Sequence, residues 1–260
     1  MSISALVLTK NEQEMIGDAL SQLGFADEII ILDQESQDKT LEIAKKYTKN
    51  IHTTAIEDYS TRRNILKQSA SGDWLLYIDP DERLSKEGIV EIKEAVEKGD
   101  HSAYYLPRKN YVLGKVQTHG GWWPDYVPKL FKAADLEKWE GKVHESPKIN
   151  GTYGYLKTPL VHKTARSMKA MLGKSTKWAK VEANLYYEAK SPKVTIPKVL
   201  KFSLFEFIKR YFIKLGILDG RVGLISSLYQ AIHNVMILTY LWEMQNNTQE
   251  AFKRINNEHK

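Results

Sequence analysis

The sequence predicts an α/β protein in which a mostly parallel central sheet is flanked by helices and followed by a helical carboxy-terminal extension. Short apolar runs alternate with helical patterns over about the first hundred residues, and two of these runs end in acidic residues. After residue 190, basic residues are interleaved with large apolar ones, which predicts the extension. Ligands of parallel α/β sheets bind beyond the carboxyl ends of the strands, so the acidic residues there are candidates for a binding site.

The expected strands are residues 3–8, 28–33, 50–54 and 74–79, and the expected helices between them are residues 11–23, 36–47 and 60–70. The helices have apolar residues at intervals of three and four, whereas the strands are short apolar runs, apart from residues 50–54, which form a poorer strand pattern. Asn11 is the expected N-cap of the first helix, because Glu14 follows three residues later. Strands separated by helices of this length imply parallel crossovers and hence a Rossmann-like, nucleotide-binding half.

Composition limits the classes of function. Hydrophobic residues at 42% and charged residues at 27% are typical of a folded protein. The sequence contains no cysteine, which excludes disulfides, thiolate metal sites and cysteine nucleophiles. The first residues lack a basic leader, so we expect a cytoplasmic protein. A net charge of +6 would suit a nucleic acid, but the densest basic residues alternate with apolar ones, so we expect an anionic membrane surface and no nucleic acid as partner.

Acidic residues follow the apolar run that begins at Trp74. Asp79 and Asp81 are two residues apart, which in an extended segment places them on one face about 7 Å apart, and Pro80 stops the strand. Asp33 ends an earlier strand and should lie at the same edge of the sheet. Such carboxylates repel one another unless Mg²⁺ or Mn²⁺, carrying a nucleotide diphosphate, compensates their charge. The simpler alternatives are an acidic turn and, for Asp33, a helix cap.

These motifs together resemble a known family. Asn11-Glu12 after the first strand, Asp33 at the start of DQESQDKT, and IDPDE after a later strand are similar to family 2 glycosyltransferases, which have a GT-A fold. The segments WEGKVHESP and RYFIKLGILDGRVGL resemble the β-1,4-glucosyltransferases of the bacterial lipopolysaccharide inner core, over nearly the whole chain. The resemblance implies metal-dependent, inverting transfer of a sugar, glucose, from a UDP-sugar to a core-oligosaccharide or other lipid-linked acceptor.

The resemblance also implies roles for individual residues. Nucleotide-sugar contacts would come from Thr9, Glu12, Asp33, Arg63 and Asp79. Asp81 would hold the metal, with His144 or His162 as a further ligand, and the sequence does not separate these two histidines. Glu145 would be the general base that deprotonates the acceptor hydroxyl. Trp122 and Trp123 would bind the acceptor by stacking, although adjacent tryptophans usually include one that packs in a core.

Each role has a simpler alternative. Arg63 could be a solvated charge on a helix, Glu145 a surface glutamate and His162 a structural histidine. Two other functions also fit an acidic sheet edge: a nucleotidyltransferase on a similar fold, and a noncatalytic module that binds membranes or polyanions. The expected division is a nucleotide-sugar-binding half (residues 1–100), an acceptor-binding half (residues 101–190) and a membrane-associated helical extension (residues 191–260).

The extension contains two helical patterns. In the first, Phe205, Ile208 and Phe212 recur at intervals of three and four, which predicts an amphipathic helix that either docks on the catalytic domain or lies on a membrane. The second, residues 222–242, has no charged residue and is long enough to span a bilayer. Because Ser226 and His233 belong to a polar stripe on one helical face, we expect peripheral binding at the inner face of the cytoplasmic membrane instead.

Overall fold

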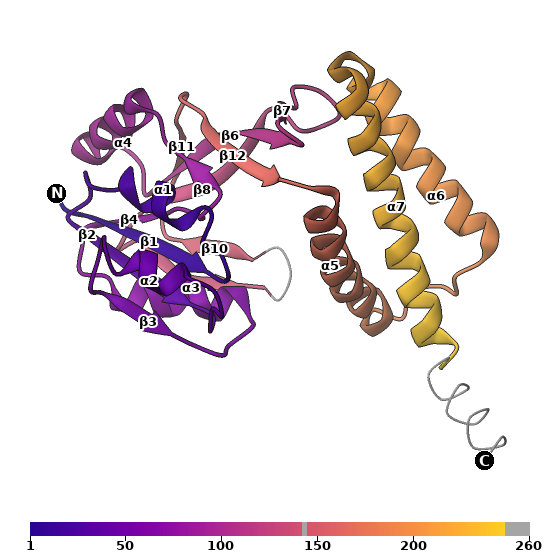
Figure 1. Cartoon of the computed structure of the whole chain (residues 1–260), viewed down its shortest axis with the longest axis horizontal. Coiled ribbons are helices and arrows are strands. Elements are labelled where there is room, and N and C mark those ends of the chain that lie inside the picture. The colour runs from indigo at the N-terminus through magenta and orange to yellow at the C-terminus, as the bar shows by residue number, and fades with distance from the viewer. Residues whose placement is uncertain (142–144, 248–260) are drawn as a thin grey trace. The chain divides into compact units, whose positions relative to one another are not determined.

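The computed structural model describes residues 1–141 and 145–247. The chain divides into two compact units (Figure 1). Among the described residues, the sheet unit comprises residues 1–110, 124–141 and 145–164, and the helical unit comprises residues 111–123 and 165–247. The three-part functional division expected from the sequence stays a prediction.

The sheet unit contains parallel strands followed by antiparallel ones. Its strands are β1 (Ile3–Thr9), β2 (Glu28–Asp33), β3 (Ile51–Thr53), β4 (Trp74–Tyr77), β5 (Glu82–Arg83), β6 (Ala103–Val112), β8 (Asp125–Lys132), β9 (Leu136–Glu140), β10 (Ser146–Ile149), β11 (Tyr153–Tyr155) and β12 (Leu160–Ala165). The main sheet has the order β3-β2-β1-β4-β8-β6-β12-β5, and β9 and β10 form a separate hairpin. Strands β3, β2, β1 and β4 are parallel, whereas β8 is antiparallel to both β4 and β6.

Helices cover both faces of the parallel strands. Every residue of β1 and β4 is buried, as expected of strands enclosed on two sides. Alternate residues of β1 belong to two different apolar clusters, with Ala5 in the cluster that includes α1 (Ile16–Ser21) and α4 (Lys86–Lys98), and Leu6 in the cluster that includes α3 (Tyr59–Ser69). A fourth helix, α2 (Thr40–Ala44), follows β2. The predicted α/β class is confirmed.

Local sequence explains where two of these four helices begin. Asp58 accepts a hydrogen bond from the Thr61 backbone N–H at the start of α3, and Ser85 does the same for α4. The prediction that Asn11 caps the first helix is wrong, because α1 begins only at Ile16. Asn11 instead has a left-handed φ of 52° and its side chain accepts a hydrogen bond from the Gln37 backbone N–H.

The helical unit is built from α5 (Met168–Glu188), α6 (Ile196–Ile208), a π-helical turn η1 (Lys209–Ile213), a 3₁₀ turn η2 (Gly216–Asp219) and α7 (Gly220–Gln245), with the short strand β7 (Lys115–Val116) paired to the end of β6. Helices α5 and α7 run parallel. Their alignment is fixed by two hydrogen bonds with the same sequence offset, from Tyr229 Oη to the Met171 carbonyl and between Ser175 Oγ and His233 Nδ1. The helical extension predicted from the sequence is confirmed.

Candidate active site

The carboxyl ends of β1, β2 and β4 lie at one edge of the parallel sheet. Thr9 and Asp33 are register partners at the ends of β1 and β2, and Asp79 follows β4, which pairs with the other side of β1. Thr9 is buried, and its Oγ1 has no hydrogen-bond partner among the described residues. A buried hydroxyl without a partner is unfavourable in the protein alone and is available to a ligand at this edge.

Asp33 is fully buried at the end of β2. Its two carboxylate oxygens accept hydrogen bonds from the backbone N–H and the hydroxyl of Ser36, at 2.8 and 2.6 Å. Asp33 therefore shapes the loop that follows β2, and it does not cap α2, which begins at Thr40. Loop shaping is compatible with donor binding, because each carboxylate oxygen can accept a second hydrogen bond.

The acids after β4 are compensated by a buried lysine. Lys129 in β8 places its Nζ 2.7 Å from Asp79 Oδ2 and 2.7 Å from Glu82 Oε2. Burial raises the pKa of Asp79, but the charges of Lys129 and Arg63 outweigh burial and hold that pKa well below its ordinary value. The cluster therefore keeps a carboxylate ionised at the sheet edge, which a simple acidic turn does not require.

Asp81 lies beside His162, which belongs to β12. Its Oδ2 is 3.4 Å from His162 Nε2, and His162 reaches this position because β12 pairs with β5. Asp81 also acts on Arg83: burial lowers the pKa of Arg83, and nearby carboxylates, including those of Asp81 and Glu12, oppose that shift. Glu12 and Asp81 thus lie near the same guanidinium, although they are far apart in the sequence.

A chain of hydrogen bonds fixes the orientation of His162. Asn110 donates from Nδ2 to Asp125 Oδ2 at 2.8 Å, so its Oδ1 is the atom that faces His162 Nδ1, at 2.6 Å. The Nδ1 proton is then donated to Asn110, and a neutral imidazole presents the lone pair of Nε2 to the carboxylate of Asp81. A cation shared by Nε2 and the carboxylate of Asp81 would stabilise this arrangement.

Asp81 and His162 fit a divalent cation as a pair of ligands. Among the described residues no group of three or more His, Cys, Asp or Glu side chains could enclose a metal ion. A pair of protein ligands still suits Mg²⁺ or Mn²⁺ in nucleotide sites, where phosphate oxygens and water complete the coordination. His144, the other histidine expected from the sequence, lies outside the described residues.

Arg63 connects Asp79 with Glu145. Its Nε donates to Glu145 Oε1 at 3.1 Å, and its guanidinium lies over the Trp139 ring, 4.6 Å from the centroid. Burial lowers the pKa of Arg63, but Asp79 and Glu145 raise it further than burial lowers it. The side chains of Arg63 and Glu145 are only 12% and 17% exposed, so neither is a solvated surface charge.

The β9–β10 hairpin brings Glu145 to Arg63. Asn64, the neighbour of Arg63 in α3, donates to the Trp139 carbonyl and accepts from the Trp139 backbone N–H. These two bonds fix β9 against α3, and Glu145 directly precedes β10, the partner strand of β9. The pair thus depends on contacts between elements about eighty residues apart in the chain.

The two tryptophans expected to bind acceptor belong to the helical unit. Trp122 is partly buried and packs against an apolar cluster that includes Val112, Ala165 and Met171. Trp123 is 38% exposed. Their burial agrees with the expectation that one of two adjacent tryptophans packs in a core, and the stacking role stays a prediction.

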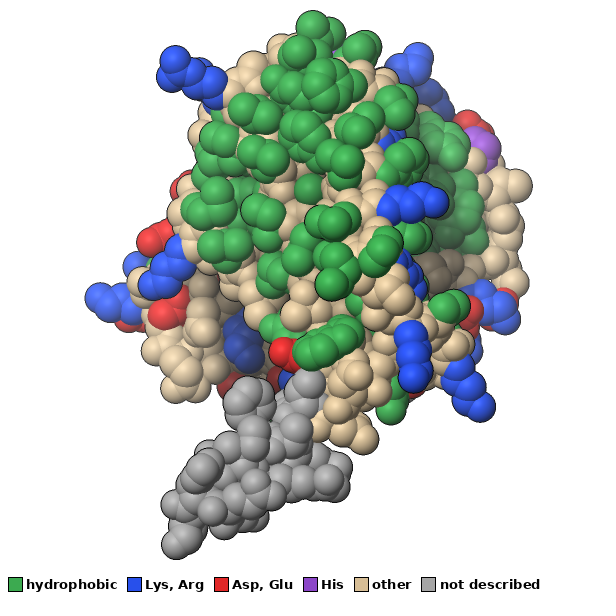
Figure 2. Space-filling view, turned by 90° about the vertical axis from the view of Figure 1, so that its right-hand side faces the viewer, with side chains coloured by type: hydrophobic (Ala, Val, Ile, Leu, Met, Phe, Trp, Pro, Cys, Tyr) green, Lys and Arg blue, Asp and Glu red, His purple; other side chains and the backbone are tan. Residues whose placement is uncertain are grey.

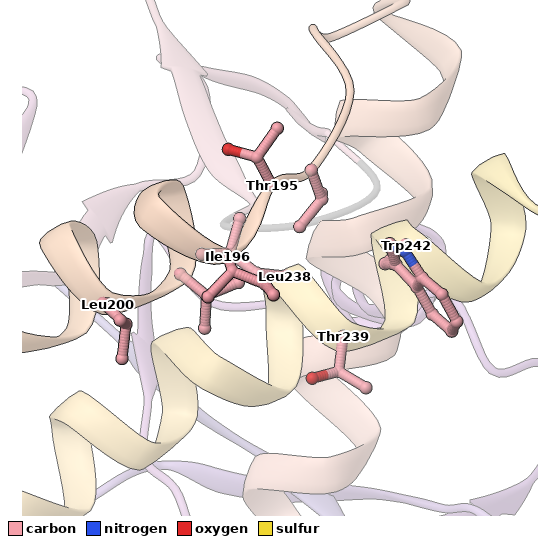
Figure 3. A pocket seen from close by; sticks show the side chains of 8 residues that line it. Thr195, Ile196, Leu200, Leu238, Thr239 and Trp242 are labelled. Atoms are coloured by element: carbon pink, nitrogen blue, oxygen red, sulfur yellow. The ribbon is translucent and has the colours of Figure 1, made fainter.

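The helical unit also contains a cavity of about 420 Å³. Its lining comes from the start of α6 and the end of α7 and includes Ile196, Leu200, Leu238 and Trp242 (Figure 3). None of the lining side chains is charged. A nucleotide diphosphate requires cations or a row of hydrogen-bond donors, so this cavity does not suit the donor.

Four residues that received no role from the sequence organise the site, although Glu82 belongs to the acidic segment after Trp74. Glu82, Arg108, Asn110 and Lys129 connect Asp79 to His162 through buried or half-buried polar contacts: Arg108 binds Asp125 at 2.9 Å, and Glu82 is fully buried. For Lys129 a signal existed, because a lysine directly before Leu130 and Phe131 in an apolar strand must be paired when buried.

Comparisons with known proteins identify the family of the chain. Residues 4–153 match glycosyl transferase family 2. An uncharacterized glycosyltransferase of Rickettsia bellii is 25% identical over 256 residues, which is 93% of this chain and 86% of that protein. The TPR repeat-containing protein of Synechococcus elongatus is 31% identical over 116 residues, 44% of this chain and only 29% of that protein. The poly(ribitol-phosphate) beta-N-acetylglucosaminyltransferase TarS of Staphylococcus aureus is 28% identical over 127 residues, 44% of this chain and 22% of TarS.

Solved structures with similar chain traces include S. aureus TarS in complex with UDP-GlcNAc, at 14% identity and a TM-score of 0.47 over 95% of this chain and 92% of that one. Glucosyl-3-phosphoglycerate synthase of Mycobacterium tuberculosis, in complex with Mg²⁺ and UDP, has 15% identity and a TM-score of 0.47 over 74% of this chain and 80% of that one. The assignment rests on the family match, which spans more than half of the sequence. The chain belongs to glycosyl transferase family 2 and has the GT-A fold of that family.

Proposed function

We propose that this glycosyltransferase moves glucose from UDP-glucose, with inversion, to a core sugar of lipopolysaccharide or to another lipid-linked acceptor at the inner face of the cytoplasmic membrane. The observation that carries the donor half of this proposal is that Arg63 lies near both Asp79 and Glu145, while Asp81, two residues after Asp79, lies beside His162. The acceptor half is supported by the motifs WEGKVHESP and RYFIKLGILDGRVGL in the sequence.

The donor would bind at the carboxyl edge of β1, β2 and β4. Asp33 and the Thr9 hydroxyl would bind the nucleoside, and Asp79 the ribose or the transferred sugar. Bound Mg²⁺ or Mn²⁺, held by Asp81 and His162, would neutralise charge on the diphosphate. Arg63 would lie close to the donor phosphates, since a guanidinium binds phosphate oxygens in pairs.

Glu145 would accept the proton of the acceptor hydroxyl. Its Oε1 bonds to Arg63, and its Oε2 has no hydrogen-bond partner among the described residues. A carboxylate oxygen within hydrogen-bond reach of the acceptor hydroxyl could take its proton as a general base. The attacking oxygen then displaces UDP from the anomeric carbon in one step, which inverts the configuration.

The family match decides against the two rival functions, a nucleotidyltransferase and a noncatalytic binding module. The donor sugar is tested by measuring UDP release and product formation with UDP-glucose, UDP-galactose and UDP-N-acetylglucosamine, the last because of the TarS relative. We expect UDP-glucose to be preferred. Asp81→Ala and Glu145→Ala should each abolish transfer, and transfer that survives both changes would refute the assigned roles.

A further inference from the structure

Helix α6 exposes a ladder of apolar side chains. Ile196, Leu200, Leu204, Ile208 and Phe212 follow one another at intervals of four residues through α6 into η1, and each is between 38% and 78% exposed. No residue of α6, all of which the structure describes, is buried. A helix with this many apolar residues normally buries one apolar face against the rest of the protein. The exposed ladder is therefore a candidate surface for binding a partner outside this chain.

Helix α7 carries a second exposed apolar stripe. Leu224, Leu228, Ile232 and Trp242 are between 37% and 50% exposed. The stripe and the ladder meet at the apolar cavity, whose lining includes Ile196 and Leu200 from α6 and Trp242 from α7. Figure 2 shows hydrophobic side chains gathered across this face of α6 and α7. The two helices therefore form one apolar surface, which we call the α6–α7 face.

The charge of the protein is concentrated in the same segment. Residues 190–221 contain eight lysines and arginines and two acidic residues, a net charge of +6, which equals the net charge of the whole chain. Both acids are engaged within the helical unit: Glu206 binds Arg210 at 2.6 Å, and Asp219 binds His119 at 2.9 Å. Lys193, Lys201, Lys214 and Arg221 are exposed.

We propose that the α6–α7 face binds an anionic lipid bilayer, with the apolar ladder of α6 inserted among the acyl chains and the surrounding lysines and arginines at the headgroups. Apolar insertion combined with basic residues is what an anionic interface favours. A second copy of this chain is a poorer partner, because two segments of +6 would face each other. Membrane binding by this face does not depend on the identity of the acceptor. Its contribution to catalysis rests on the proposed function, in which the acceptor is lipid-linked.

The contacts of α7 favour lying on the bilayer over spanning it. Within the described residues, Gly216–Gln245 is long and apolar enough to cross a membrane, with a mean hydropathy of 1.3. However, the polar face of α7 is covered by α5, where His233 bonds to Ser175 and lies 3.4 Å from Glu182. Helix α5 runs alongside α7, so an α7 that spanned the bilayer would carry α5 into the hydrocarbon with it. The exposed Lys177 and Lys180 of α5 would then lie in the hydrocarbon, which is unfavourable.

The test is flotation of the full chain with vesicles of phosphatidylcholine alone and of phosphatidylcholine mixed with phosphatidylglycerol. We expect binding to the mixed vesicles only. The double variant Leu200→Glu/Leu204→Glu should bind roughly tenfold or more weakly, since it removes two inserted side chains. Lys201→Gln and Lys214→Gln should each weaken binding about fivefold, and added salt should reduce binding further.

Val90→Glu is the matched control, since Val90 is an exposed apolar residue of α4, 55% accessible. It should bind as the unmodified protein does. Absence of binding to mixed vesicles, or binding that Leu200→Glu/Leu204→Glu leaves unchanged, would overturn the proposal, as would self-association that this variant abolishes without any vesicle binding. Hydrolysis of UDP-sugar in solution should be unaffected by the double variant, so loss of membrane binding is distinguishable from failure of the proposed reaction.

Discussion

Arg63 Nε lies 3.1 Å from Glu145 Oε1. The charge of the same guanidinium, together with that of Lys129, lowers the pKa of Asp79 against the effect of burial. One buried cation therefore joins the proposed base to the acid that follows β4. If Arg63 also contacts the donor phosphates, donor binding and the position of the base are linked through a single side chain. The role of Glu145 as a base can be tested by a substitution that keeps its hydrogen bond to Arg63 and removes only its ability to take a proton.

Glu145→Gln should lower kcat for transfer by about 10²–10⁴, the usual contribution of a general base, and should leave KM for the donor nearly unchanged. The amide still accepts a hydrogen bond from Arg63 but cannot take a proton. Steady-state kinetics with varied donor concentration measures both quantities. A large rise in donor KM with unchanged kcat would assign Glu145 to donor binding instead.

Lys129→Met should destabilise the fold by about 3–5 kcal/mol, because it leaves the carboxylates of Asp79 and Glu82 without their buried partner. The free energy of unfolding in urea measures this loss. Lys138→Met is the control: Lys138 pairs with Glu140 but is 56% exposed, so its loss should be under about 1 kcal/mol. Equal effects of the two changes would contradict the buried pairing.

Stability should fall at acidic pH because of Asp79. Its pKa in the folded protein is below the ordinary value of about 3.9, so its ionisation stabilises the fold fully above that value and the contribution is lost as pH falls toward the folded pKa. Unfolding in urea should therefore show a steeper loss as pH falls from about pH 5 to about pH 2 in the unmodified protein than in Asp79→Asn. Parallel curves would show that Asp79 is not the responsible group.

Asn110→Leu should weaken Mn²⁺ binding about 10–100-fold, although it changes neither of the proposed metal ligands, Asp81 and His162. Asn110 fixes the tautomer and ring orientation of His162, and the apolar variant removes that hydrogen bond. Calorimetric titration with Mn²⁺ in the presence of UDP measures the effect. His233→Asn, a histidine change in the helical unit, should leave the affinity unaltered, and a similar loss in both variants would point to a general structural effect.

The sequence was sufficient for the parts of the fold that depend on local pattern. The largely apolar runs of β1 and β4 predicted buried parallel strands, and the aspartates that follow the apolar runs of β2 and β4 predicted the edge at which Asp33 and Asp79 lie. Asn11 was misassigned because its side chain bonds to a neighbouring loop, at Gln37, and not to its own helix. A contact between segments 26 residues apart cannot be predicted from the spacing of residues within one helix.

The pairs that complete the candidate site could not be predicted from spacing. Lys129 meets Asp79 because β8 inserts antiparallel beside β4, and His162 meets Asp81 because β12 pairs with β5. Both contacts depend on the order of strands in the sheet, which local periodicity does not determine. Resemblance to a family gave His162 and Glu145 as candidates, but only the fold places Asn110 beside His162 and Lys129 beside Asp79.

The coupling between metal and nucleotide tests the central claim most directly. Mn²⁺ affinity should be measured with and without UDP in the unmodified protein and in Asp81→Asn. If the cation is shared by Asp81, His162 and the diphosphate, UDP should raise Mn²⁺ affinity, Mn²⁺ should raise UDP affinity by the same factor, and Asp81→Asn should abolish both effects. Independent binding of the two ligands, or coupling that persists in Asp81→Asn, would contradict the account.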